Sequence, residues 1–130
     1  MTEKTSVTSA IVLFAHGSRD PQWSAPIEEI ARRLRLQDDH SPVCCAYLEL
    51  MTPSLPQAVE QLLSSYPALK TVCIFPVFLG MGRHAREDLP EICRDLRAQH
   101  PSIEFRQLPS AGESPQVLEA IAAAASAALR

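Results

Sequence analysis

Residues 11–19 read Ile-Val-Leu-Phe-Ala-His-Gly-Ser-Arg, an unbroken apolar run that ends in an abrupt polar turn. A short continuous apolar run is typical of a parallel strand that is covered by helices on both faces. The glycine after His16 allows a sharp change of direction, and the apolar spacing of a helix begins a few residues later. The stretch therefore predicts the first strand–helix unit of an α/β domain, with His16 directly after the strand.

The same alternation of an apolar run and an amphipathic stretch occurs four times along the chain. Strands are predicted over residues 7–15, 42–50, 71–79 and 102–107. Helices are predicted to begin at Ser24, at Ser54, near Asp88 and at Ser114. Four such units predict a flavodoxin-like α/β fold, in which a four-stranded parallel sheet with the strand order 2-1-3-4 carries helices on both faces.

Two details of this prediction concern the ends of elements. Pro76 has no N–H for strand pairing, so it marks a bulge or the end of the third strand. The last helix is expected to face the core with an apolar stripe formed by Leu118, Ile121, Ala122 and Ala125.

The composition is that of an ordinary globular protein. The chain has 130 residues, of which 46% are hydrophobic, and we expect residues 1–130 to form a single domain. A net charge of −3 provides no basic field for nucleic acid, so no nucleic-acid partner is expected. No apolar run reaches about 18 residues, so we expect no membrane span and a cytoplasmic location. The cysteines form no C-x-x-C pair and are expected to pack as small apolar residues: Cys44, Cys45, Cys73 and Cys93.

A second histidine, His84, follows the third predicted strand much as His16 follows the first. In the order 2-1-3-4 the first and third strands are neighbours, and their carboxyl ends border one crevice. Glu49 ends the second strand, on the far side of the first. Two imidazoles and a carboxylate can hold a first-row divalent ion and leave coordination positions open, so these three residues are the candidate metal ligands.

Each of these residues also has a structural explanation, which the sequence leaves open. His16 can belong to an ordinary strand–helix turn, and Glu49 can face solvent at the end of its strand. A small phosphate-ester enzyme that uses His16-Gly17 is a further alternative, but Ala15 stands where histidine phosphatases carry an arginine.

Residues 80–85, Gly-Met-Gly-Arg-His-Ala, match the letters of a dinucleotide-binding fingerprint. The segment follows the third strand rather than the first, and the next helix is expected only near Asp88, so we interpret residues 80–86 as a loop instead. This loop and the first turn would surround the crevice with positive charge from Arg19, Arg83 and Arg86. Such local charge allows a protein with net negative charge to bind an acidic ligand.

Three linked motifs carry a resemblance to a known family. They lie at residues 16–21, 48–55 and 76–90. They resemble CbiX-type sirohydrochlorin chelatases, class II enzymes that insert Co²⁺, Fe²⁺ or Ni²⁺ into sirohydrochlorin, and the resemblance covers roughly residues 9–112. It implies the chelatase fold and assigns the catalytic and metal-handling roles to His16 and His84. It also implies an acidic metal contact at Glu49.

The resemblance implies further properties. The chain is similar to the short form of the family, which has one domain and works as a homodimer. The partner would be sirohydrochlorin or a related acidic tetrapyrrole on the way to cobalamin or sirohaem. No permanent cofactor is expected, because the divalent ion is itself a substrate, with Co²⁺ placed before Fe²⁺ and Ni²⁺.

The residues expected to bind the substrate lie in two segments. They are Ser18, Arg19, Phe78, Leu79, Gly80, Met81, Arg83 and Arg86. The arginines would pair with carboxylates, and the apolar side chains would pack on the macrocycle face or serve only to pack the loop. A protein that binds a tetrapyrrole or a metal without catalysis remains the alternative on the same fold.

Overall fold

The computed structural model describes residues 4–38 and 40–130. Within them one parallel sheet has the strand order β2-β1-β3-β4, as the sequence predicts. Its strands are β1 (Ser9–Ala15), β2 (Val43–Tyr47), β3 (Thr71–Pro76) and β4 (Glu104–Gln107). The α-helices are α1 (Ala25–Gln37), α2 (Leu55–Ser65), α3 (Arg83–Gln99) and α4 (Pro115–Ala127).

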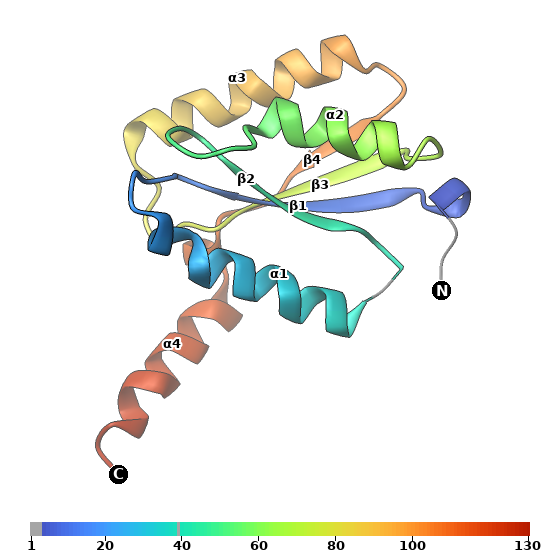
Figure 1. The fold of residues 1–130 in the computed structure, drawn as a ribbon. Coiled ribbons are helices and arrows are strands. Elements are labelled where there is room, and N and C mark those ends of the chain that lie inside the picture. Colours follow the sequence, from blue (N-terminus) through green and yellow to red (C-terminus); the bar gives the residue numbers. More distant parts are fainter. Residues whose placement is uncertain (1–3, 39) are drawn as a thin grey trace.

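Helices cover the two faces of the sheet unequally. Helices α2 and α3 lie on one face and α1 lies on the other (Figure 1). The core under α2 and α3 is the larger one and includes Phe14, Leu55, Ile74 and Leu89. The core under α1 is smaller and centres on Leu13. Strand residues alternate between these layers because successive side chains of a strand point to opposite faces.

The predicted helix caps are confirmed at two of the serines. The Ser54 hydroxyl accepts a hydrogen bond from the backbone N–H of Gln57, whose side-chain oxygen accepts one from the backbone N–H of Ser54. Ser114 accepts a hydrogen bond from the N–H of Val117 at the start of α4. Ser24 precedes α1 but makes no side-chain cap bond, because a 3₁₀ turn, η2 (Pro21–Ser24), leads directly into that helix.

Two predicted boundaries are wrong in ways that matter for function. The second strand ends at Tyr47, so Glu49 lies in the following loop rather than at the strand end. Helix α3 begins at Arg83, so His84 stands in its first turn and not in a loop. The start of α3 could not be recognised in the sequence, because most residues of its first turn are charged and exposed and the apolar stripe begins only at Leu89. Two features of the sequence argue against a dinucleotide site at residues 80–85. The first, a helix start near Asp88, is wrong, whereas the second, the position of the segment after the third strand rather than the first, still holds.

The expected inward stripe of α4 is also wrong. No residue of α4 is buried, and the helix projects away from the rest of the chain (Figure 1). The stripe exists in the sequence, but the helix leaves the domain at an angle that gives the stripe nothing to pack against within one copy. Pro76, by contrast, is the last residue of β3, as expected for a residue without an N–H.

Candidate functional site

The loops after β1 and β2 are paired backbone to backbone at the carboxyl edge of the sheet. The N–H of Leu48 donates to the carbonyl of Ala15, and the N–H of Glu49 donates to the carbonyl of His16, with N–O distances of 2.9 and 3.1 Å. Gly17 has φ +99°, and a Cβ there would lie 1.8 Å from the Glu49 carbonyl oxygen. Only glycine allows this approach, so the glycine after the first strand is required for the backbone hydrogen bonds that hold the two loops together.

This pairing brings His16 and Glu49 side by side. The His16 Nε2 atom lies 3.1 Å from Glu49 Oε1, and the two side chains are 49% and 55% exposed. The predicted meeting of an imidazole and a carboxylate at this edge is present, although Glu49 reaches it from the loop. A half-exposed pair of this kind is accessible to an ion or a ligand from solvent, and its carboxylate attracts a cation.

His84 reaches the same edge from a different element. Beyond β3 the chain still follows β1, because the N–H of Val77 donates to the carbonyl of Phe14 with an N–O distance of 2.7 Å. Gly82 then caps α3, and His84 is exposed in the first turn of that helix. Within residues 4–38 and 40–130 no group of three or more His, Cys, Asp or Glu side chains is arranged to hold a metal ion. The structure thus pairs His16 with Glu49 and leaves His84 outside that pair.

The predicted arginines lie on exposed segments of this edge. Arg19 is exposed, in a turn where the Ser18 hydroxyl accepts a hydrogen bond from the N–H of Asp20. Arg83 pairs with Glu87 one helical turn further on, at an N–O distance of 3.1 Å. Exposed pairs of this kind are weak, so Arg83 can exchange this carboxylate for one on a ligand.

A cavity of about 490 Å³ lies between the β3–α3 connection and the segment after β4. Three of the residues that the sequence predicts to bind substrate line one side of it: Leu79, Met81 and Arg86. The sequence interpretation missed the other side of the cavity, formed by Gln107, Ser110, Gly112 and Glu113. Their sequence signal is the Ser-x-x-Glu pattern of residues 110–113, in which the Glu113 carboxylate accepts hydrogen bonds from the N–H and hydroxyl of Ser110.

The apolar residues expected to contact a macrocycle differ in exposure. The Phe78 ring packs against Phe14, with ring centroids 6.1 Å apart, and Met81 also packs partly on the larger core. Leu79 is 65% exposed, and Gly80 is exposed with open space around it. Leu79 and Gly80 therefore present the accessible part of this segment, while Phe78 anchors it to the core.

The cysteines pack as predicted. Cys93 is buried, and the other three are partly buried and unpaired. Burial raises the pKa of the Cys44 thiol to about 11, and burial likewise raises the pKa of the Cys45 and Cys93 thiols. Because a thiol binds a metal as the thiolate, these protonated thiols are poor ligands near neutral pH.

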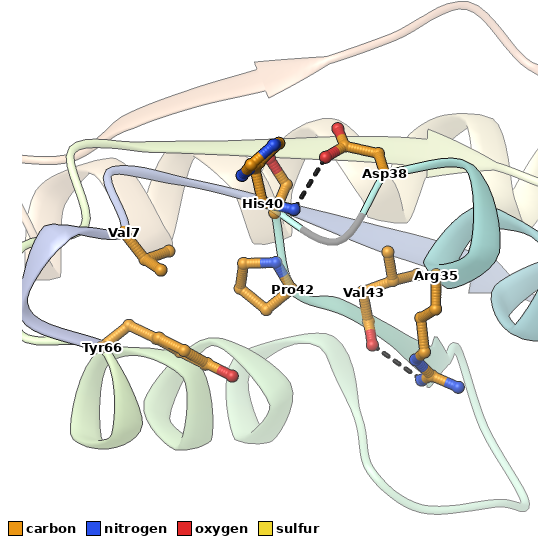
Figure 2. A pocket seen from close by; sticks show the side chains of 8 residues that line it. Val7, Arg35, Asp38, His40, Pro42, Val43 and Tyr66 are labelled. Atoms are coloured by element: carbon orange, nitrogen blue, oxygen red, sulfur yellow. Dashed lines mark hydrogen bonds between the residues drawn. The ribbon is translucent and has the colours of Figure 1, made fainter. Parts of the chain in front are cut away.

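A second cavity, of about 300 Å³, lies at the amino edge of the sheet (Figure 2). It contains a histidine, an acid and an arginine, and here the side chains of the acid and the arginine bind backbone atoms. Asp38 accepts a hydrogen bond from the N–H of His40, and Arg35 donates to the carbonyl of Val43, as the dashed lines in Figure 2 show. Ligands of open parallel α/β sheets bind at the carboxyl ends of the strands, so the His16 edge is the candidate site.

The open parallel sheet and its flanking helices define the class of this protein as an α/β protein, with a histidine–carboxylate pair at the carboxyl edge as its candidate site. The CbiX family model matches residues 10–128, and the chain belongs to the CbiX family. Among the described residues, no helix is both long and apolar enough to cross a bilayer.

Similar proteins carry related names. The chain is 31% identical over 83 residues to the sirohydrochlorin cobaltochelatase of Methanococcus maripaludis and 34% identical over 82 residues to that of Methanothermobacter thermautotrophicus. The two matches cover 64% and 63% of this chain, but only 56% and 55% of the relatives' own lengths.

Solved structures share the fold. The CbiX protein from Marinobacter aquaeolei VT8 has a TM-score of 0.79 and 30% identity, with 93% of this chain and 97% of that chain covered. The sirohydrochlorin chelatase SirB from Bacillus subtilis subspecies spizizenii, solved in complex with cobalt, has a TM-score of 0.74 and 21% identity. That match covers 88% of this chain and 48% of the Bacillus chain, and it shows the common fold.

Proposed function

We propose that this chain is a sirohydrochlorin chelatase, which inserts a divalent metal ion into the tetrapyrrole. The observation that carries the proposal is the His16–Glu49 pair, with its Nε2–Oε1 distance of 3.1 Å, at the carboxyl edge of a CbiX-family sheet. Membership of that family and the cobaltochelatase names of the archaeal relatives support the same reaction. Co²⁺ is the ion that we propose first, with Fe²⁺ and Ni²⁺ as alternatives that imidazole and carboxylate ligands also accept.

Metal insertion replaces two pyrrole N–H protons with one divalent ion. In the proposed reaction His16 binds the incoming ion through an imidazole nitrogen, and the Glu49 carboxylate offsets the positive charge that gathers there. His84, at the first turn of α3, takes the two protons from the pyrrole nitrogens one at a time and releases each to solvent, to which its side chain is exposed, because imidazole is a suitable general base. The ion leaves with the product, so it is a substrate and no permanent cofactor is required.

The substrate would lie across the exposed edge beside these groups. Sirohydrochlorin carries carboxylate side chains, for which Arg19, Arg83 and Arg86 supply donors at the rim. The macrocycle face would rest on the exposed Leu79 and Gly80. This arrangement would let a chain with a net charge of −3 bind an acidic ligand, because the arginines supply donors for its carboxylates at that edge.

We propose in addition that the chain acts as a homodimer. The chain spans about half the length of the Bacillus chelatase with which it shares its fold, and no residue of α4 is buried in the described structure of one copy. A second copy would supply a further domain of the same kind.

The test is to mix the purified protein, sirohydrochlorin and Co²⁺ and to follow the absorption spectrum of the tetrapyrrole. We expect insertion well above the spontaneous rate. Binding of sirohydrochlorin with no rate above the spontaneous one would instead indicate a carrier on the same fold. A His40→Ala variant, altered at the opposite edge of the sheet, provides the matched control and is expected to insert cobalt normally.

A further inference from the structure

The two faces of the sheet differ in how much of each is covered. On the face under α2 and α3, Val72 and Ile74 of β3 are fully buried. On the opposite face their neighbours Cys73 and Phe75 are only partly buried, because α1 covers the β2–β1 half and none of the described helices lies over β3 (Figure 1). Parallel sheets almost always have both faces covered, so the second half of this face lacks a helix.

The uncovered region is an apolar groove of about 340 Å³ beside α1. Its lining side chains are apolar or weakly polar: Ile11, Leu13, Ile30, Leu34, Cys73, Phe75 and Leu108. Among the residues that the structure describes, no charged side chain lines it. A groove of this kind favours an apolar helix face over a polar ligand.

Helix α4 has an exposed apolar stripe that matches the apolar groove in character. Leu118 and Ile121 are 49% and 45% exposed, and with Ala122 and Ala125 they form one stripe along the helix. A helix of 13 residues is only marginally stable in water without tertiary packing, so α4 needs a surface to cover its stripe. At about 1.5 Å per residue it is about 20 Å long, similar to the seven-residue strand β1 at about 3.3 Å per residue.

The connection to α4 is too well anchored for the helix to return to its own groove. The N–H of Gly112 donates to the carbonyl of Phe78 with an N–O distance of 2.7 Å, and a Cβ on Gly112 would lie 1.7 Å from the Leu79 carbonyl oxygen. Ser110 is buried and bonded to Glu113. Ser114 is both the C-cap of the 3₁₀ helix η3 (Ala111–Glu113) and the N-cap of α4, so no linker residue separates the two helices.

We propose that α4 of one copy packs into the apolar groove of a second copy, whose α4 fills the groove of the first. The inference rests on the proposed homodimer and names the surface that holds it together. An exchange of this kind has two-fold symmetry, so the same two surfaces of each copy are used. It covers both exposed stripes and both grooves, and the assembly is complete at two copies. The chain itself supplies both halves of the contact, which is why a second copy, and not an unrelated protein, is the occupant.

The test measures mass in solution by sedimentation or light scattering. The wild-type chain is expected at twice the monomer mass of 14.3 kDa. The double variant Leu118→Glu/Ile121→Glu is expected at the monomer mass, because it places charges in an apolar contact. The matched control Ala120→Glu/Ala123→Glu adds the same charges on the opposite side of α4 and is expected to stay dimeric.

A groove variant, Ile30→Glu, is expected to be monomeric too; Ile30 is 37% exposed, so the domain should still fold, and circular dichroism checks this. Mixing the groove variant with the α4 variant leaves one intact helix and one intact groove, so a heterodimer of about twice the monomer mass should return.

Three results would overturn the inference: a monomeric wild type, a dimer that survives the charged stripe, or no heterodimer on mixing, as expected if α4 closed on its own copy. Cobalt insertion by the wild type is measured separately. Loss of the proposed function and loss of the proposed contact therefore give different results.

Discussion

The two edges of the sheet carry the same kinds of side chain and use them differently. The amino edge has His40, Asp38 and Arg35, while the carboxyl edge has His16 and Glu49 with arginines nearby. At the amino edge the charged groups of Asp38 and Arg35 bind backbone atoms and close the chain around β2 (Figure 2). At the carboxyl edge the imidazole and the carboxylate face each other and stay half exposed.

This difference shows that residue type alone does not make a site. Parallel strands end together, so loops from β1, β2 and β3 converge at one edge, and their side chains can act on one ligand. At the other edge the chain enters the strands, and its polar groups are needed to pair backbone atoms. Substitutions of matched residues at the two edges test whether function depends on the carboxyl edge alone.

The largest effect is expected from the histidines. His84→Ala should lower the rate of cobalt insertion about a thousandfold, because the proposed base is removed. His40→Ala, at the amino edge, should leave the rate unchanged. The measurement is the initial rate of the absorption change, with circular dichroism to check the fold. Normal insertion by the His84 variant would remove His84 from the proposed mechanism.

A large loss of stability is expected at Gly17. An alanine there would force φ +99° on a residue with a side chain and place its Cβ against the Glu49 carbonyl, at a cost of about 3 kcal/mol in the free energy of unfolding. Gly80→Ala is the control on the same edge, since a Cβ there meets open space. Urea unfolding of the two variants provides the comparison. Equal midpoints would mean that the two loops are not held as tightly as the geometry implies.

A smaller effect on rate is expected at Glu49. Glu49→Gln keeps the shape of the side chain and removes its charge beside His16, and we expect about a tenfold lower rate, as for the loss of a group that supports a metal ligand. Asp38→Asn makes the same change at the amino edge and should have no effect on the rate. An unchanged rate in the Glu49 variant would leave the carboxylate without a part in metal handling.

The smallest effect is expected at Arg19. Its side chain is exposed, so its pairing with a substrate carboxylate is screened by water, and Arg19→Ala should raise KM about fivefold with kcat nearly unchanged. Arg33→Ala removes another exposed arginine, which pairs with Glu29 on α1, and should leave KM unchanged. A change in kcat alone for Arg19→Ala would argue against a binding role.

The strand order and the meeting of His16 with Glu49 could be predicted from the sequence. Apolar runs marked the strands, and chain order with the rules for parallel sheets placed strands 1 and 3 side by side. The start of α3 could not be seen, because a charged, exposed first turn has no apolar period to reveal it. The far wall of the cavity beside Leu79 was missed because Ser110 and Glu113 come close to that segment only in the folded chain.

The sequence by itself determined the α/β class, the sheet order and the histidines that follow its strands, since these depend on local periodicity and on chain order. Only the tertiary structure decided where the apolar stripe of α4 points. Its sequence predicts a helix with one apolar side, and a stripe of this kind fits an intramolecular core and a contact between copies equally well. The anchored turn before Pro115 directs the helix away from its own sheet, because a helix follows the direction of the residues that cap it.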